Sequence, residues 1–359
     1  MWLESLRIRG LRCLDDVTVP LTPGVTVFAG PNGAGKTSLL EAAFLLSHGR
    51  SFRSGAREAL LKRGADSLSI FAELRHADSR LRRFGLGRQG ARWEARMDGA
   101  GISLSELVGE CAVVCFEPGS HALIAGGAEE RRRYLDWGVF HVEHDFILAW
   151  RRYQRALKQR NALLRSSSTV PDAQFLPWEV ELGAAASLMD QQRELYLSAL
   201  RTHLMSSIEG LLPELGLVEL RYRRGWAEGA DLTELLAAQR GRDIARGHTT
   251  QGSHRADWSI AFDHAPLREH LSRGQEKLTA LACVLAQASL YAERRGEWPV
   301  VCLDDLASEL DKAHQVAVVE QLRAVGAQVL VTGTEVPEAL MDGPTQVFHV
   351  EQGHLSPLL

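Results

Sequence analysis

The fold of this chain is decided by the octapeptide Gly30-Pro31-Asn32-Gly33-Ala34-Gly35-Lys36-Thr37. This stretch fits the pattern G-x-x-x-x-G-K-[ST] at every fixed position. An apolar run at 25–29 precedes it, and a helical pattern at 37–47 follows it. Strand, loop and helix in this order are the context that a phosphate-binding loop requires. The octapeptide therefore predicts a binding site for a nucleoside triphosphate rather than a glycine-rich turn that happens to carry a lysine.

Each fixed position of this loop has a chemical role. Glycines allow successive backbone N–H groups to turn inward around a di- or triphosphate, and the helix N-terminus adds the positive end of its dipole. Lys36 is expected to reach the β- and γ-phosphates, and Thr37 to place its hydroxyl on Mg²⁺. All eight residues are therefore candidate ligands of the nucleotide, with Mg²⁺ as the accompanying cation.

A second motif lies far downstream, where a buried-strand pattern at 300–303 ends in Asp304 and Asp305. Two adjacent aspartates can simply cap a turn or a helix. Beside a phosphate loop, however, the first can hold Mg²⁺ through water, and the second can orient or deprotonate the attacking water. We expect Asp304 on the metal side and Asp305 near the water, which makes Lys36, Asp304 and Asp305 the candidate catalytic residues.

A third motif, Leu271-Ser272-Arg273-Gly274-Gln275, opens a predicted helix at 276–293. It resembles the L-S-G-G-Q signature of ABC-type ATPases, although a serine N-cap with a glycine nearby is the simpler reading of the segment alone. In that family the signature of one subunit closes over the ATP held by another. The resemblance therefore implies that Ser272, Gly274 and Gln275 contact ATP across a homodimer.

The resemblance to ABC-type ATPases also exposes two departures. Asp305 is one methylene shorter than the glutamate common at this place, so we expect slow hydrolysis. Transporter ATPases place a histidine near the γ-phosphate after the next strand, where this chain has Thr332 and Thr334. Either threonine is a candidate substitute.

The coarse pattern predicts an α/β fold: an ABC-type ATPase head of mixed sheet and helices, plus a short antiparallel helical arm. Strand and turn patterns dominate the beginning of the chain, and two helical stretches, with a break near 141–144, follow. We expect residues 1–140 and 213–359 to form the head and residues 141–212 to form the arm. Candidate inward positions of the second arm helix are Leu182, Leu188, Leu195, Leu200 and Leu204.

Composition is that of an ordinary globular protein: of 359 residues, 45% are hydrophobic and 24% are charged. We do not expect the charged beginning of the chain to be a signal peptide. The longest apolar stretch of the whole sequence is too polar for a membrane span. The five cysteines form no C-x-x-C pair, so we interpret them as small apolar side chains. We therefore expect the protein in the cytoplasm.

The net charge of −4 conceals an asymmetry. Residues 1–165 carry 25 Lys and Arg against 18 Asp and Glu, a surplus of 7, whereas the remainder carries 16 against 27, a deficit of 11. A basic half fits contact with nucleic acid, although a solvated face explains it as well. The candidate DNA contacts follow the loop helix and are Arg50, Arg53, Arg57, Lys62 and Arg63.

Nearly the whole chain resembles the RecF family of bacterial recombination-mediator ATPases. Beyond the three ATPase motifs, the resemblance rests on segments 6–12, 49–53, 129–137 and 254–257. Three departures are Gly126-Gly127, where Ser-Pro or Gly-Pro is usual, Ser253 in place of proline, and Glu276 in place of a second glutamine. None of them removes a phosphate or metal ligand.

This resemblance implies an ATP-dependent homodimer that binds duplex DNA or duplex–single-strand junctions. It also implies action with RecR and RecO in loading RecA onto gapped DNA, during repair, replication-fork maintenance and the SOS response. Two other classes stay open. One is the ATPase subunit of a membrane transporter, which usually has a shorter helical insertion and the histidine that this chain lacks. The other is a DNA-bridging protein that holds ATP without hydrolysing it. A measurement of ATP turnover would distinguish that protein from a slow ATPase.

Overall fold

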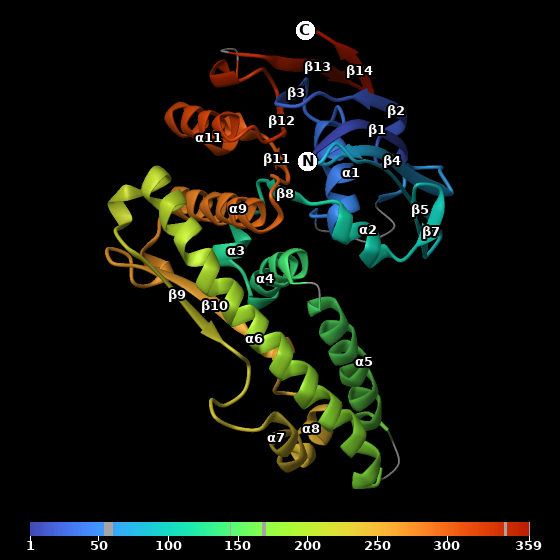
Figure 1. The fold of residues 1–359 in the computed structure, drawn as a ribbon, viewed down its shortest axis with the longest axis vertical. Coiled ribbons are helices and arrows are strands. Elements are labelled where there is room, and N and C mark those ends of the chain that lie inside the picture. Colours follow the sequence, from blue (N-terminus) through green and yellow to red (C-terminus); the bar gives the residue numbers. More distant parts are fainter. Residues whose placement is uncertain (54–59, 144, 167–169, 341–342, 359) are drawn as a thin grey trace. The chain divides into compact units, whose positions relative to one another are not determined.

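The computed structural model describes the chain except for residues 54–59, 144, 167–169, 341–342 and 359. The described chain folds into two compact units (Figure 1). Unit 1 comprises Met1–His121, Ser206–Pro213 and Arg273–Leu359, and unit 2 comprises Ala122–Met205 and Glu214–Ser272.

Unit 1 contains a sheet of buried strands that is parallel except at one edge. In spatial order its strands are β14 (His354–Pro357), β13 (Thr345–Glu351), β3 (Val25–Ala29), β12 (Val329–Gly333), β11 (Val300–Leu303) and β8 (Val113–Phe116). Only β14 runs antiparallel to its neighbour. Every residue of β3, β11 and β12 is buried, as expected for parallel strands covered on both faces. The carboxyl ends of these strands meet at one edge, where the phosphate loop begins.

The second sheet of unit 1 is antiparallel. Its spatial order is β2 (Leu14–Pro20), β1 (Trp2–Leu11), β4 (Ser67–Arg75), β5 (Leu81–Gln89), β6 (Arg92–Met97) and β7 (Ala100–Ile102). Along β4, buried and more exposed residues alternate, because one face of the sheet is packed and the other is open to solvent. The packed face contributes Leu68, Ile70, Ala72 and Leu74 to the core.

Helix α1 connects the two sheets, because it contacts β1 of the antiparallel sheet as well as β8 and β12 of the parallel one. The helices of unit 1 are α1 (Lys36–His48), α2 (Leu104–Glu110), α9 (Arg273–Arg295), α10 (Leu306–Glu309) and α11 (Lys312–Ala324), with the 3-10 turn η5 (Glu338–Leu340). This arrangement is the mixed sheet with helices that the sequence predicts for an ATPase head.

Unit 2 is mainly helical. Its helices are α3 (Ala122–Ala125), α4 (Ala128–Val142), α5 (Phe146–Leu164), α7 (Leu232–Ala238), α8 (Arg240–Arg246) and most of α6 (Asp172–Leu211). A two-stranded ribbon joins β9 (Val218–Arg223) to β10 (Asp257–Phe262), and short 3-10 turns form η2 (Pro213–Leu215), η3 (Ser253–Arg255) and η4 (Arg268–His270). The predicted break near 141–144 lies between α4 and α5.

This division differs from the predicted boundaries at 140 and 212. Residues 122–140 and 214–272 belong to unit 2 rather than to the unit with the parallel sheet. The strand pattern after 216 suggests a return to the head, but β9 and β10 pair with each other and not with either sheet of unit 1. The inward positions predicted for α6 are also wrong in part, because Leu188 and Leu195 are exposed.

Buried ion pairs hold the segments of unit 2 together. Arg160 of α5 is fully buried, and its guanidinium donates to Glu179 of α6 (3.2 Å), Asp243 of α8 (2.7 Å), Thr249 (2.9 Å) and the carbonyl oxygen of Leu236 of α7 (3.0 Å). One side chain thus links four helices. A buried charge is tolerated only when its hydrogen-bonding groups are satisfied in this way.

Replacing Arg160 should therefore destabilise unit 2 strongly. We expect Arg160→Met to lower the free energy of unfolding by about 3–5 kcal/mol, because it leaves the buried carboxylate of Asp243 without a cationic partner among the described residues and leaves Glu179 with Arg240 alone. Arg152→Met is the matched control on the same helix, since Arg152 is half exposed and pairs with Glu181 at the surface. Urea denaturation, with hydrogen exchange in α5, measures both variants. Equal stability of the two would contradict the role given to the buried network.

Candidate nucleotide-binding site

The phosphate loop is a closed turn between β3 and α1. The N–H of Gly30 donates to the carbonyl oxygen of Gly333 at the end of β12 (3.3 Å). The carbonyl oxygen of Ala34 in turn accepts a hydrogen bond from the N–H of Gly353 (2.8 Å). A side chain at position 30 would place its Cβ 2.1 Å from the carbonyl oxygen of Val350, so only glycine fits there. The loop is therefore fixed against the end of the parallel sheet.

Lys36 lies inside this loop. Its side chain is buried, and Nζ donates to the carbonyl oxygens of Gly30 (2.7 Å) and Pro31 (2.8 Å). Burial lowers the pKa of Lys36, and the nearby carboxylates of Asp305 and Asp304 oppose that shift. The ammonium group is thus enclosed by the loop, as expected for a group that binds the terminal phosphates.

The carboxylate of Asp304 connects three elements. The hydroxyls of Thr37 on α1 (2.9 Å) and Thr332 on β12 (2.6 Å) both donate to its Oδ1 atom. Burial raises the pKa of Asp304, and the hydrogen bonds from Thr332 and Thr37 act in the opposite direction. A hydroxyl and a carboxylate oxygen side by side are the hard ligands that Mg²⁺ prefers. The residues present therefore fit a magnesium nucleotide.

Asp305 adopts an uncommon backbone conformation. Its φ of 54° and ψ of 40° lie in the left-handed region, and its N–H donates to the hydroxyl of Thr332 (2.8 Å). Such a conformation in a non-glycine residue costs on the order of 1–3 kcal/mol and is concentrated at functional sites. Thr332 therefore binds both the carboxylate of Asp304 and the backbone of Asp305.

A third carboxyl group at this edge is absent from the sequence prediction. Glu117 follows β8, whose last residue Phe116 is in parallel register with Leu303, so Glu117 and Asp304 follow neighbouring strands. Burial raises the pKa of Glu117, and the negative charge of Asp304 raises it further. The available signal was an acidic residue directly after the buried run 113–116. Glu117 is therefore a further candidate for the carboxyl group that orients the attacking water.

Glu41 is a second functional candidate that sequence reasoning missed. It is fully buried on α1 and accepts hydrogen bonds from Arg12 (3.0 and 2.7 Å) and Ser51 (2.5 Å). Arg53 lies 3.8 Å from the same carboxylate. The signal for it was an acidic residue inside an otherwise apolar helix. Glu41 thus positions two arginines on the side of α1 that leads to the site.

The predicted DNA contacts have different immediate surroundings in the described structure. Arg53 is close enough to Asp304 to lower the pKa of that carboxyl, which places it beside the nucleotide site. Lys62 pairs with Asp15 (3.2 Å), and Arg50 and Arg63 are exposed. Arg57 lies outside the described residues. DNA contact by these residues stays a prediction, and Arg53 has a second candidate role at the nucleotide.

The signature residues lie at the beginning of α9. Ser272 and Gly274 are exposed and Gln275 is half-buried, so this turn is accessible to another molecule. The two threonines proposed in place of the histidine differ sharply. Thr332 is buried and bound to Asp304, whereas Thr334 is exposed just after β12. Thr334 is therefore the better candidate for a phosphate contact.

Comparisons with known proteins agree with this geometry. The profile of the RecF/RecN/SMC N terminal domain matches residues 2–356. A protein of Xanthomonas euvesicatoria pv. vesicatoria (strain 85-10), named DNA replication and repair protein RecF, is 46% identical over 99% of this chain and 98% of its own length. This chain belongs to the RecF family. A protein of the same name from Shewanella loihica (strain ATCC BAA-1088 / PV-4) is 37% identical, with 99% of each chain covered.

Solved structures show the same fold. The recombination mediator protein RecF with ATPrS, in the RecFOR pathway, gives a TM-score of 0.89 at 25% identity, covering 100% of this chain and 98% of the other. An SMC head bound to the C-winged helix domain of ScpA gives 0.58 at 16% identity, with 100% and 97% covered, and shows the fold alone. None of these comparisons favours the transporter subunit. Among the described residues, no helix is long and apolar enough to cross a membrane.

Replacing Lys36 tests the site directly. We expect Lys36→Met to reduce ATP affinity by about 100-fold, because two charge-assisted hydrogen bonds to the phosphates contribute roughly 3 kcal/mol. The fold should persist, since the methionine retains the buried aliphatic part of the side chain. Calorimetric titration with ATP measures the effect, and Lys312→Met, a change at an exposed lysine, is the control. Unchanged affinity in Lys36→Met would refute the site.

Proposed function

We propose that this protein is an ATP-dependent DNA-binding protein of recombinational repair and replication-fork maintenance. In this proposal ATP drives the formation of a homodimer, and slow hydrolysis reverses it. The observation that carries the proposal is the arrangement of Lys36, Thr37, Asp304 and Thr332 at the end of the parallel sheet, in a chain of the RecF family. The proposal therefore rests on an intact nucleotide site.

The proposed roles follow from the surroundings of each residue. Lys36 and the N–H groups of the loop bind the phosphates, and Thr37 and Asp304 hold Mg²⁺. The cation, when bound, neutralises charge on the phosphate oxygens. Asp305 orients the attacking water, and the half-buried Glu117 follows a neighbouring strand of the same sheet edge. Hydrolysis is slow because the short Asp305 side chain holds that water less closely than a glutamate would.

Dimerisation is proposed from the exposed beginning of α9. Ser272, Gly274 and Gln275 are accessible and lie at a helix N-terminus, which favours an anionic ligand. In our proposal these residues bind the γ-phosphate of the ATP held by a second copy of the chain. The nucleotide is then enclosed between two molecules, which makes the dimer depend on ATP.

The proposed partners come from the names of the similar proteins. Relatives are named DNA replication and repair proteins, and a similar structure belongs to the RecFOR pathway. We accordingly propose that the dimer binds duplex DNA and duplex–single-strand junctions and acts with RecO and RecR to load RecA on gapped DNA, including in the SOS response. We also propose a cytoplasmic location, because a protein of this function acts on chromosomal DNA.

A change at Asp305 separates ATP binding from hydrolysis. We expect Asp305→Asn to keep ATP affinity near that of the wild type and to slow turnover at least about tenfold, because only the group that orients water is altered. The ATP-bound dimer should persist longer as a result. Single-turnover hydrolysis and light scattering measure the two effects. A variant with wild-type turnover would move the role to another carboxyl, with Glu117→Gln as the next variant.

DNA binding is tested at Lys62 and Arg63. If they contact phosphates, affinity falls steeply with salt, and the log–log slope loses about 0.9 for each contact removed. Lys62→Ala with Arg63→Ala should weaken binding to all duplex sequences alike, because phosphate contacts carry no sequence information. Lys312→Ala with Arg294→Ala removes the same charge from exposed positions on α11 and α9.

Filter binding over a salt series, with and without ATP, measures these DNA affinities. ATP should raise the affinity of the wild type, since a dimer presents two basic surfaces to one duplex. Turnover without DNA should be unchanged in both double variants. An affinity indifferent to both salt and ATP would contradict the proposed function and return attention to a partner other than DNA.

A further inference from the structure

The solvent-facing side of the antiparallel sheet in unit 1 carries an exposed aromatic ring. Phe71 of β4 is 41% exposed, whereas its neighbours Ile70 and Ala72 point into the core. Its partner across the sheet is Gly85 of β5, and Ser69 pairs in the same way with Gly87. On the β5 side the ring therefore stands beside a stretch of sheet that has almost no side chains, and on the other side its partner is Arg7 of β1.

The fold does not require these two glycines. Neither has a φ in the left-handed region, and an added Cβ would lie 3.7 Å from the Cβ atom of Arg96 at Gly85 and 3.9 Å from the carbonyl oxygen of Leu68 at Gly87. Both distances are ordinary van der Waals contacts. Glycine inside a strand nonetheless costs roughly 0.5–1 kcal/mol relative to alanine. Such glycines often mark a place where a ligand approaches the backbone closely.

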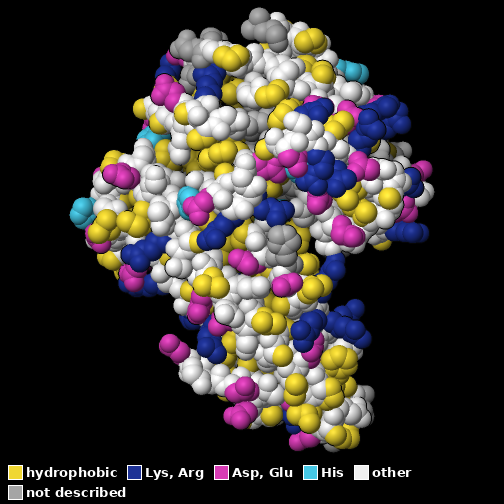
Figure 2. Space-filling model, viewed as in Figure 1, with side chains coloured by type: hydrophobic (Ala, Val, Ile, Leu, Met, Phe, Trp, Pro, Cys, Tyr) yellow, Lys and Arg dark blue, Asp and Glu magenta, His cyan; other side chains and the backbone are white. Residues whose placement is uncertain are grey.

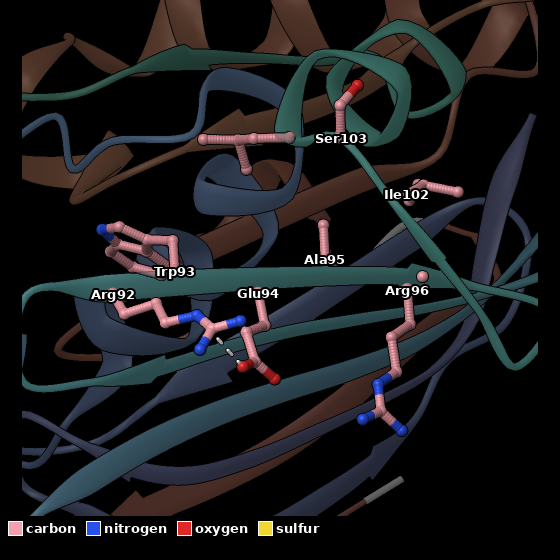
Figure 3. Close-up of a pocket in the computed structure, with 9 residues that line it drawn as sticks. Arg92, Trp93, Glu94, Ala95, Arg96, Ile102 and Ser103 are labelled. Atoms are coloured by element: carbon pink, nitrogen blue, oxygen red, sulfur yellow. Dashed lines mark ion pairs between the residues drawn. The ribbon is translucent and has the colours of Figure 1, made fainter.

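An arginine borders this glycine floor on the side away from Phe71. Arg96 of β6 pairs with Gly85, so Phe71 and Arg96 are two strands apart, or about 10 Å between Cα atoms. Figure 3 shows Arg92, Glu94 and Arg96 on one side of β6 and Trp93 and Ala95 on the other. Arg92 pairs with Glu94 (3.4 Å), whereas Arg96 is exposed and has no acidic partner among the described residues.

The other arginines of this surface leave the ring uncovered. Arg7 and Arg9 of β1 donate to Asp16 of β2 (2.8–3.1 Å), on the far side of β1 from Phe71. Figure 2 shows basic side chains interspersed with acidic ones over this part of unit 1. The charged residues of this sheet face have a surplus of two positive charges and are Arg7, Arg9, Arg75, Arg83, Arg92 and Arg96 against Glu4, Asp16, Glu73 and Glu94.

An exposed aromatic ring and a free arginine on an open sheet face are groups that bind unpaired nucleobases. The ring stacks on a base, and the arginine contacts the adjacent phosphate. A duplex can stack on such a ring only after two of its own base pairs unstack, which costs about a few kcal/mol per step, whereas an unpaired base does not have this cost. The glycine floor allows the base to lie flat against the sheet. The net positive charge suits an anionic partner, and the exposed ring beside a flat glycine floor favours a nucleobase over the side chains of an acidic peptide or of a second copy.

We propose that Ser69, Phe71, Gly85, Gly87 and Arg96, called here the Phe71 platform, bind an unpaired base of single-stranded DNA next to a duplex. In this arrangement Phe71 stacks on the base, the two glycines form the floor, and Arg96 binds the phosphate. The platform deepens the proposed function and rests on it, since it assigns the single-stranded part of a junction to residues distinct from Lys62 and Arg63.

The test compares a blunt duplex with the same duplex carrying a single-stranded oligothymidine tail, both with ATP. We expect Phe71→Ala to reduce affinity for the tailed duplex about tenfold, from the loss of one stacked base, and to leave the blunt duplex unchanged. Val325→Ala is the matched control, because Val325 is also an apolar residue of unit 1 that is 41% exposed. It should affect neither DNA.

A second variant excludes a merely structural effect of Phe71. Gly85→Val fills the floor with a residue that favours strands, so thermal stability should be kept or raised while affinity for the tail falls. The platform is refuted if both variants bind the tailed duplex as the wild type does, or if they lose blunt duplex equally. A wild type that binds no DNA, with or without ATP, would instead overturn the proposed function itself.

Discussion

The hydrogen bonds to the buried carboxylate of Asp304 are the interaction on which the rest of the nucleotide site depends. Asp304 lies at the end of β11, and the hydroxyls of Thr37 and Thr332 join it to the start of α1 and the end of β12. Thr332 also receives the N–H of Asp305, so one hydroxyl orients both carboxylate positions. A buried carboxylate costs free energy unless it is hydrogen-bonded, and these two hydroxyls supply those bonds.

This constraint explains how distant parts of the sequence form one site. Thr37 and Asp304 are 267 residues apart, but β3, β12 and β11 are parallel neighbours whose carboxyl ends share one edge of the sheet. A segment inserted between these strands in the sequence does not disturb that edge of the sheet. The helical unit 2 is such an insertion, and it has its own buried ion pairs, namely those of Arg160 and the pair of Arg193 on α6 with Asp136 on α4 (2.8 Å). Each unit thus has an independent source of stability.

On the open face of the antiparallel sheet, by contrast, some residues are not required by the fold. Its packed side has a continuous apolar core, but on the solvent side Gly85 and Gly87 give up strand propensity with no local backbone requirement. A sheet held by one apolar face can accept such residues on the other, because the core fixes the register. The residues of the exposed face can therefore serve a function without destabilising the fold.

The sequence by itself determined the phosphate loop, the carboxylate pair and the family, because these depend on local patterns of glycine, lysine and aspartate at fixed spacing. Only the tertiary structure decided which strands meet. The β9–β10 ribbon looked like a continuation of the head, because strand propensity does not reveal its pairing partner. Leu188 and Leu195 fit a helical period yet face solvent, since the period alone does not say which side of α6 is covered. Glu117 and Glu41 were missed for the same reason: a lone acidic residue acquires a role only when distant segments fold against it.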